Sequence, residues 1–102
     1  MSYTALLEMK FPDDKVEQVK EALVRLLPES RQFEGCDAMT AHQSTDDPTV
    51  MVLVQRWASK EAHAKYMAFR GGLAKAGPND TATVMGNLAE PPSLRRFDDV
   101  AT

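Results

Sequence analysis

The clearest hydrophobic pattern in the chain lies in residues 49–57. Val50–Val54 is an unbroken apolar run, rich in β-branched side chains, and it is too short for a helix of ordinary length. An apolar run that does not alternate is typical of a strand buried on both faces. We therefore predict a central strand over Thr49–Trp57. A second chain is the simplest cover for its second face, because a domain of this size buries only a modest share of its surface.

The hydrophobic period changes from that of a strand to that of a helix after Trp57. The predicted helix runs from Lys60 to Arg70, and Ser59 suits its N-cap. Gly71-Gly72 is expected to end it. One helical face collects side chains spaced at i, i+3, i+4 and i+7, namely His63, Tyr66, Met67 and Arg70. The pattern therefore points polar and aromatic groups in one direction, beside the end of the central strand.

The first third of the chain predicts a strand followed by a helix. Tyr3–Phe11 largely alternates between apolar and polar positions, as a strand does. Asp14 and Glu17 have the spacing of a capping box. Apolar residues then recur along one helical face, at Val16, Val19, Leu23, Leu26 and Leu27. Pro28 is expected to end this helix, which leaves Glu29–Glu34 as an irregular or one-turn link.

A β-hairpin is predicted in the middle of the chain. Thr45–Pro48 combines Asp and Pro residues that favour a turn. It joins a strand over Cys36–Ser44 to the central strand over Thr49–Trp57, most simply as an antiparallel pair.

Two further elements complete the predicted order. After a loop over Leu73–Asn79, a short third helix is capped by Asn79 or Asp80 and must stop before Pro91-Pro92. Ser93–Val100 then forms a last strand of low apolarity, which we expect at an edge or at an interface. The order β-α-β-β-α-(α)-β predicts an α+β, ferredoxin-like domain with an antiparallel sheet.

Composition narrows the class of protein. A chain of 102 residues is expected to form a single domain over residues 1–102. Its formal net charge of −3 argues against a nucleic-acid partner. Cys36 is the only cysteine, so no intrachain disulfide can form. The sequence has neither a signal-peptide pattern nor the ~20 apolar residues of a membrane span, and we expect a cytoplasmic protein without a membrane partner.

Four local motifs resemble those of one known family. They are Gly35-Cys36, the turn Asp46-Asp47-Pro48, the strand leading into Trp57-Ala-Ser-Lys-Glu-Ala, and the ending Leu88-Ala-Glu-Pro-Pro-Ser-Leu-Arg-Arg-Phe. Together they resemble the antibiotic biosynthesis monooxygenase (ABM) family. The resemblance implies a homodimer whose two sheets pack into a dimeric α/β barrel. It also implies oxygenation of a quinol, phenol or anthrone-like molecule with O2 and with no cofactor.

The chain departs from this family at one position. Many members carry a histidine nine residues after the tryptophan, where this chain has Tyr66, and its own histidine is His63, one turn earlier. Some relatives degrade haem and need a differently placed histidine. Haem degradation is therefore not expected of this chain.

Three residues are candidate catalytic groups. Trp57 can form a cavity wall whose indole N–H meets a substrate oxygen, although a buried tryptophan is often only core. His63 can accept a phenolic proton, because its pKa lies near neutrality, or it can be a partly exposed helix residue. Arg70 can stabilise an oxyanion, although a solvated arginine near a helix C-terminus needs no function.

Three more residues are candidate substrate-binding groups. Tyr66 lies at the centre of the apolar helix face, which favours packing over a role as an acid, but its hydroxyl can orient a ligand. Met67 borders the same face. His42 lies within a predicted strand and either reaches the cavity or lies on the surface. No metal site is expected, because the two histidines and one cysteine lack the spacing of a metal-binding motif.

Two functions from different classes remain open. The first is a cofactor-independent monooxygenase that deprotonates an electron-rich aromatic molecule, stabilises the oxyanion and excludes water. The second is a non-catalytic, dimeric small-molecule-binding or accessory module that uses the same cavity without chemistry. Oxygen uptake in the presence of quinols and anthrones distinguishes them.

Overall fold

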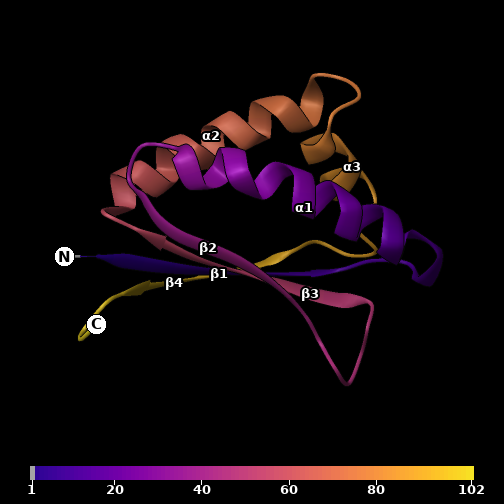
Figure 1. Cartoon of the computed structure of the whole chain (residues 1–102), viewed down its shortest axis with the longest axis horizontal. Coiled ribbons are helices and arrows are strands. Elements are labelled where there is room, and N and C mark those ends of the chain that lie inside the picture. Colours follow the sequence, from indigo (N-terminus) through magenta and orange to yellow (C-terminus); the bar gives the residue numbers. More distant parts are fainter. Residues whose placement is uncertain (1) are drawn as a thin grey trace.

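The computed structural model describes residues 2–102, which form a four-stranded sheet and a layer of helices (Figure 1). The elements in chain order are β1 (Tyr3–Lys10), the 3-10 helix η1 (Asp13–Lys15), α1 (Val16–Gln32), β2 (Cys36–Gln43), β3 (Val50–Trp57), α2 (Lys60–Lys75), α3 (Asp80–Gly86) and β4 (Ser93–Asp98). No helix within this part of the chain is both long and apolar enough to cross a membrane.

The sheet has the order β2-β3-β1-β4, and every neighbouring pair is antiparallel. The hairpin between β2 and β3 and the position of β4 at an edge confirm two sequence predictions. All three α-helices lie on one face of the sheet, with α3 beside the C-terminal end of α2 (Figure 1). The predicted α+β, ferredoxin-like fold is confirmed.

The core lies between the helices and the inner face of the sheet. Along β3 the side chains alternate, so Met51, Leu53, Gln55 and Trp57 are buried, whereas Val50, Val52 and Val54 are half-buried on the outer face. A single chain therefore covers only one face of the strand that the sequence predicts to be covered on both. The outer face also carries Phe97, which is 45% exposed.

The first helix departs from the prediction at both ends. No side chain caps its N-terminus, because η1 precedes it and Lys15 occupies the N-cap position, so the predicted Asp14–Glu17 capping box is wrong. The predicted end at Pro28 is also wrong, since α1 continues to Gln32. Pro28 lacks the N–H that would bond the carbonyl of Val24. Val24 is 70% exposed, so water can satisfy that carbonyl.

The second helix also runs further than predicted. Gly71 and Gly72 do not end it, and it continues to Lys75. Neither glycine has a positive φ, whereas Gly77, which follows the C-cap, has a φ of +98°. Glycine in a helix interior costs only about 1 kcal/mol relative to alanine, and the packing of a long helix tolerates that cost.

Side-chain caps at two helix starts agree with the sequence. The hydroxyl of Ser59 accepts a hydrogen bond from the backbone N–H of Ala62 at 3.1 Å, which fixes the start of α2. The side chain of Asn79 accepts from the N–H of Ala82 at 2.8 Å and fixes the start of α3. These caps set the rotation with which both helices present side chains to the sheet.

Candidate functional site

An apolar cavity of ≈ 80 Å³ lies between the sheet and the helices. Aliphatic and methionine side chains from β1, β3 and all three α-helices form most of its wall. The polar side chains at the wall are Gln55, Tyr66, Arg70 and Thr81. A mostly apolar pocket with a few convergent polar groups is typical of a small-molecule site.

Gln55 reaches the cavity from the inner face of β3 and is only 1% exposed. The indole Nε1–H of Trp57 donates to its Oε1 at 3.1 Å. Because an indole nitrogen can only donate, this bond fixes which end of the amide is the oxygen. The side-chain NH2 of Gln55 donates no hydrogen bond to the described residues 2–102, so it is the end of this amide that can donate to a ligand oxygen.

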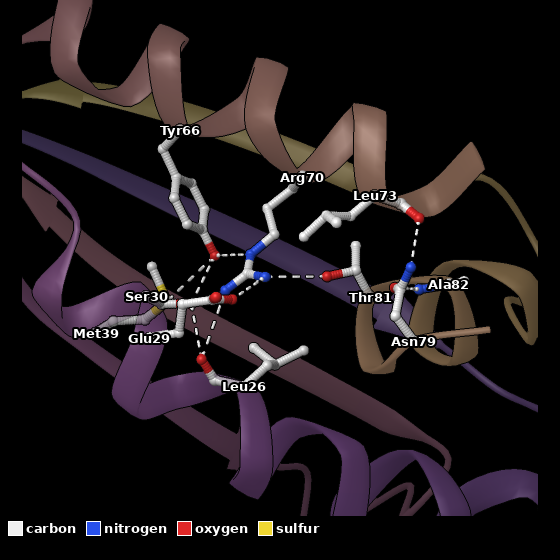
Figure 2. Close-up of polar contacts among 10 residues, drawn as sticks. All are labelled: Leu26, Glu29, Ser30, Met39, Tyr66, Arg70, Leu73, Asn79, Thr81 and Ala82. Atoms are coloured by element: carbon white, nitrogen blue, oxygen red, sulfur yellow. Dashed lines mark hydrogen bonds and ion pairs between the residues drawn. The ribbon is translucent and has the colours of Figure 1, made fainter. Parts of the chain in front are cut away.

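Arg70 lies at the centre of a polar cluster that joins the three α-helices (Figure 2). Its Nε donates to the hydroxyl of Tyr66 at 2.9 Å, and its Nη2 donates to the Ser30 hydroxyl at 2.7 Å. Its Nη1 contacts a carboxylate oxygen of Glu29 at 2.9 Å and the hydroxyl of Thr81 at 3.0 Å. The guanidinium is thus held by α1, α2 and α3, and its side chain is only 11% exposed.

The direction of the hydrogen bonds around Tyr66 follows from their donors. The Ser30 hydroxyl donates to the carbonyl of Leu26 at 3.2 Å and accepts from Arg70. Its single proton is then used, so Tyr66 is the donor in the 2.8 Å contact between the two hydroxyl groups. Tyr66, whose side chain lines the cavity, therefore accepts from Arg70 and donates to Ser30.

His63 lies one helical turn before Tyr66, is buried, and does not line the cavity. It is 3% exposed, and its ring lies 5.7 Å from that of Trp57 and 5.5 Å from that of Tyr3. Burial lowers the pKa of His63, and the positive charge of Arg96 lowers it further. Its Nε2 has no hydrogen-bond partner in the described part of the chain.

The structure separates the six candidate residues into three groups. Tyr66, Met67 and Arg70 line the cavity, as the spacing on the helix predicts. Trp57 and His63 do not line it, although Trp57 contacts the wall through Gln55 and through its ring, 4.9 Å from that of Tyr66. The expected single cavity lined by Trp57, His63, Tyr66 and Arg70 is therefore corrected to one that two of the four line.

His42 lies on the outer face of the sheet and is exposed. Its Nε2 is 2.8 Å from the hydroxyl of Thr40, two residues earlier on the same face of β2. The expectation that His42 reaches the cavity is therefore wrong. The alternative, a position on the surface, is confirmed. Within residues 2–102 no three His, Cys, Asp or Glu side chains gather where they could hold a metal ion.

Sequence reasoning missed three polar residues of the site. Gln55 interrupts the apolar inner face of β3, and a polar side chain at such a position was the one available signal. Ser30 lies beyond the predicted end of the first helix, and Thr81 lies in the short helix α3. Their roles depend on how α1 and α3 meet α2, which no local pattern encodes.

Comparison with known proteins gives the same fold from independent evidence. A protein of Nitrosomonas europaea assigned to the antibiotic biosynthesis monooxygenases is 24% identical, over 97% of this chain and 90% of that one, with a TM-score of 0.84. Rv0793 from Mycobacterium tuberculosis is 19% identical, over 100% and 98%, with a TM-score of 0.79. PA3566 from Pseudomonas aeruginosa is 17% identical, over 98% and 95%, with a TM-score of 0.77.

No curated protein matches the chain in sequence. The sequence profile of the family described as antibiotic biosynthesis monooxygenase, however, matches residues 2–69, which is more than half of the chain. The resemblance suggested by the local motifs around Trp57 is therefore confirmed. The chain belongs to the antibiotic biosynthesis monooxygenase family and forms a monooxygenase-like module of this fold.

Proposed function

We propose that the protein oxygenates an electron-rich aromatic molecule, such as a quinol, phenol or anthrone, with O2 and without a cofactor. The observation that carries this proposal is the apolar cavity whose wall presents the amide of Gln55, oriented by Trp57. An aromatic ring matches the aliphatic and methionine wall. The substrate oxygen, which becomes negatively charged when its proton leaves, matches the NH2 donors of Gln55.

The reaction we propose is balanced by the substrate and O2 alone. The deprotonated substrate transfers one electron to O2, and the resulting pair of radicals forms a C–O bond. Protonation gives a hydroperoxide, which loses water and leaves a carbonyl group. One oxygen atom enters the product, the other leaves as water, and the substrate supplies all four electrons that reduce O2. The protein binds the ring, stabilises the oxyanion and excludes bulk water from the radical pair.

The proposed reaction also needs a group that accepts the proton of the substrate. Tyr66 and Arg70 are the titratable residues at the cavity wall, and both are held in the Ser30 cluster. We propose that water at the cavity opening accepts the proton, because buried His63 does not line the cavity. The lack of a carboxylate or imidazole at the described wall favours the second candidate, a non-catalytic small-molecule-binding module.

Replacement of Gln55 tests the proposed site. Gln55→Met keeps the side chain's length but removes both NH2 donors, and kcat for oxygen uptake should fall by about 10²-fold, as for loss of one oxyanion donor. The measurement is oxygen consumption with a panel of quinols and anthrones. Val24→Ala is the control, because Val24 is 70% exposed on α1 and lies neither at the cavity wall nor on the outer face of the sheet.

Two other results would contradict the proposal. Equal activity of Gln55→Met and the unaltered protein would show that Gln55 does not stabilise the oxyanion. Binding of the aromatic panel to the unaltered protein with no oxygen consumption would favour the binding module.

We also propose that the protein is a homodimer in which the outer faces of two sheets pack together as an α/β barrel. The half-buried valines of β3 and the exposed Phe97 give that face an apolar surface. Placing a charge in its middle, as in Val52→Asp, should prevent assembly, because an unpaired buried carboxylate is costly.

Light scattering measures this effect directly. The unaltered protein should have twice the mass of one chain at micromolar concentration, and Val52→Asp should be monomeric or unfolded. Val24→Asp, on the exposed side of α1, is the control and should leave the mass unchanged. A monomeric unaltered protein would contradict the barrel.

A further inference from the structure

Gly71 occupies a position where the backbone gives no reason for glycine. It lies in the interior of α2, which is regular from Lys60 to Lys75, and its φ is not positive. Glycine weakens a helix at such a position. A Cβ built at Gly71 would meet no atom within 4 Å, so close packing does not exclude a side chain either.

The position of Gly71 relative to the cavity suggests a reason. Gly71 is exposed to solvent and also lines the cavity, whereas Leu7 and Leu53 at the inner wall are buried. A residue that is at once exposed and part of the wall lies where the cavity meets the surface. Met67, Ala74 and Met85, all half-buried, line the cavity in the same region, on α2 and α3.

The size of the cavity limits what it can enclose. Its ≈ 80 Å³ is far below the roughly 300–1,000 Å³ of pockets that enclose drug-sized ligands. One ring is then the largest aromatic group that fits with little rearrangement. Any second ring must lie in the opening, where the flexible methionine side chains can adjust to it.

We propose that Gly71 determines which aromatic molecules enter the site. Because it has no side chain, it leaves an opening between α2 and α3 through which a fused two-ring molecule can place one ring inside and the other at the surface. This inference rests on the proposed function only in taking an aromatic molecule as the ligand. A side chain at this position would lean toward the preceding turn of the helix, across Met67, and occupy the part of the opening where the second ring would lie.

The two adjacent glycines provide a matched pair of variants. Gly71→Leu places a side chain across the opening, whereas Gly72→Leu adds the same side chain about 100° further around α2. Gly72 is exposed and does not line the cavity. Both substitutions replace glycine by a better helix former, so both proteins should melt at a higher temperature than the unaltered one. A difference between them in binding is then not a difference in folding.

The experiment is calorimetric titration of the purified protein with 1-naphthol and with phenol under anaerobic conditions. We expect Gly71→Leu to weaken naphthol binding at least tenfold and phenol binding much less, and Gly72→Leu to bind both as the unaltered protein does. Equal affinities of the two variants for naphthol would overturn the proposal, as would failure of the unaltered protein to bind naphthol. Naphthol binding that follows the expected pattern, without oxygen consumption in air, would overturn only the monooxygenase function.

Discussion

Replacing Trp57 with alanine should lower the free energy of unfolding by about 3–5 kcal/mol. The same variant should have no activity. Trp57 is fully buried and packs against the rings of Phe33, His63 and Tyr66. A loss of this size is a large part of the roughly 5–15 kcal/mol that stabilises a typical domain. Chemical denaturation followed by circular dichroism, with oxygen uptake on the same samples, measures both effects.

Trp57→Phe separates packing from orientation. Phenylalanine retains most of the buried apolar area but lacks the N–H that donates to Gln55. We expect this variant to fold, to lose much less stability than Trp57→Ala, and still to lose most of its activity because the amide of Gln55 can turn. Full activity in a folded Trp57→Phe protein would show that the indole serves only as core.

Replacing Arg70 with leucine should lower stability by about 1–3 kcal/mol for each buried hydroxyl group that is left without its donor. Arg70 is the common donor to four side chains, namely Tyr66, Ser30, Thr81 and Glu29. Its loss removes the hydrogen bonds that join α2 to α1 and α3. The cavity lies between these helices, and ligand affinity should fall with stability. Thermal melting and naphthol titration measure the two effects.

Glu29→Gln is the matched control for the Arg70 variant. Glu29 is 60% exposed, and loss of its charge should cost at most about 1 kcal/mol, as for surface ion pairs. A similar small loss in Arg70→Leu would mean that the hydroxyl groups rearrange and that the cluster does not hold the helices together.

The sequence was sufficient for the order of elements because its hydrophobic periods are strong. Alternation in the first strand, the apolar run over Val50–Val54 and the helical spacing after Lys60 each reappear in the structure. The errors concern helix ends at Pro28 and at Gly71-Gly72. At these positions local propensity predicts the end of a helix, but packing of the inner helix face against the sheet stabilises the longer helix.

The site was predictable only as far as one helix face. Spacing on α2 correctly grouped Tyr66, Met67 and Arg70 at the cavity. It could not show that His63, one turn earlier, does not line the cavity, or that the register of β2 places His42 on the outer face. Those positions depend on the length of the cavity along α2 and on strand register, which are set by tertiary packing.

A crystal structure of the protein with 1-naphthol, grown without oxygen, tests the central claim most directly. We predict that one ring occupies the cavity and that the naphthol oxygen lies within about 3.2 Å of the Gln55 side-chain nitrogen, a normal hydrogen-bond distance. The second ring should lie beside Gly71. Naphthol bound instead on the His63 side of Trp57, or on the outer face of the sheet, with the cavity empty, would contradict the proposed site.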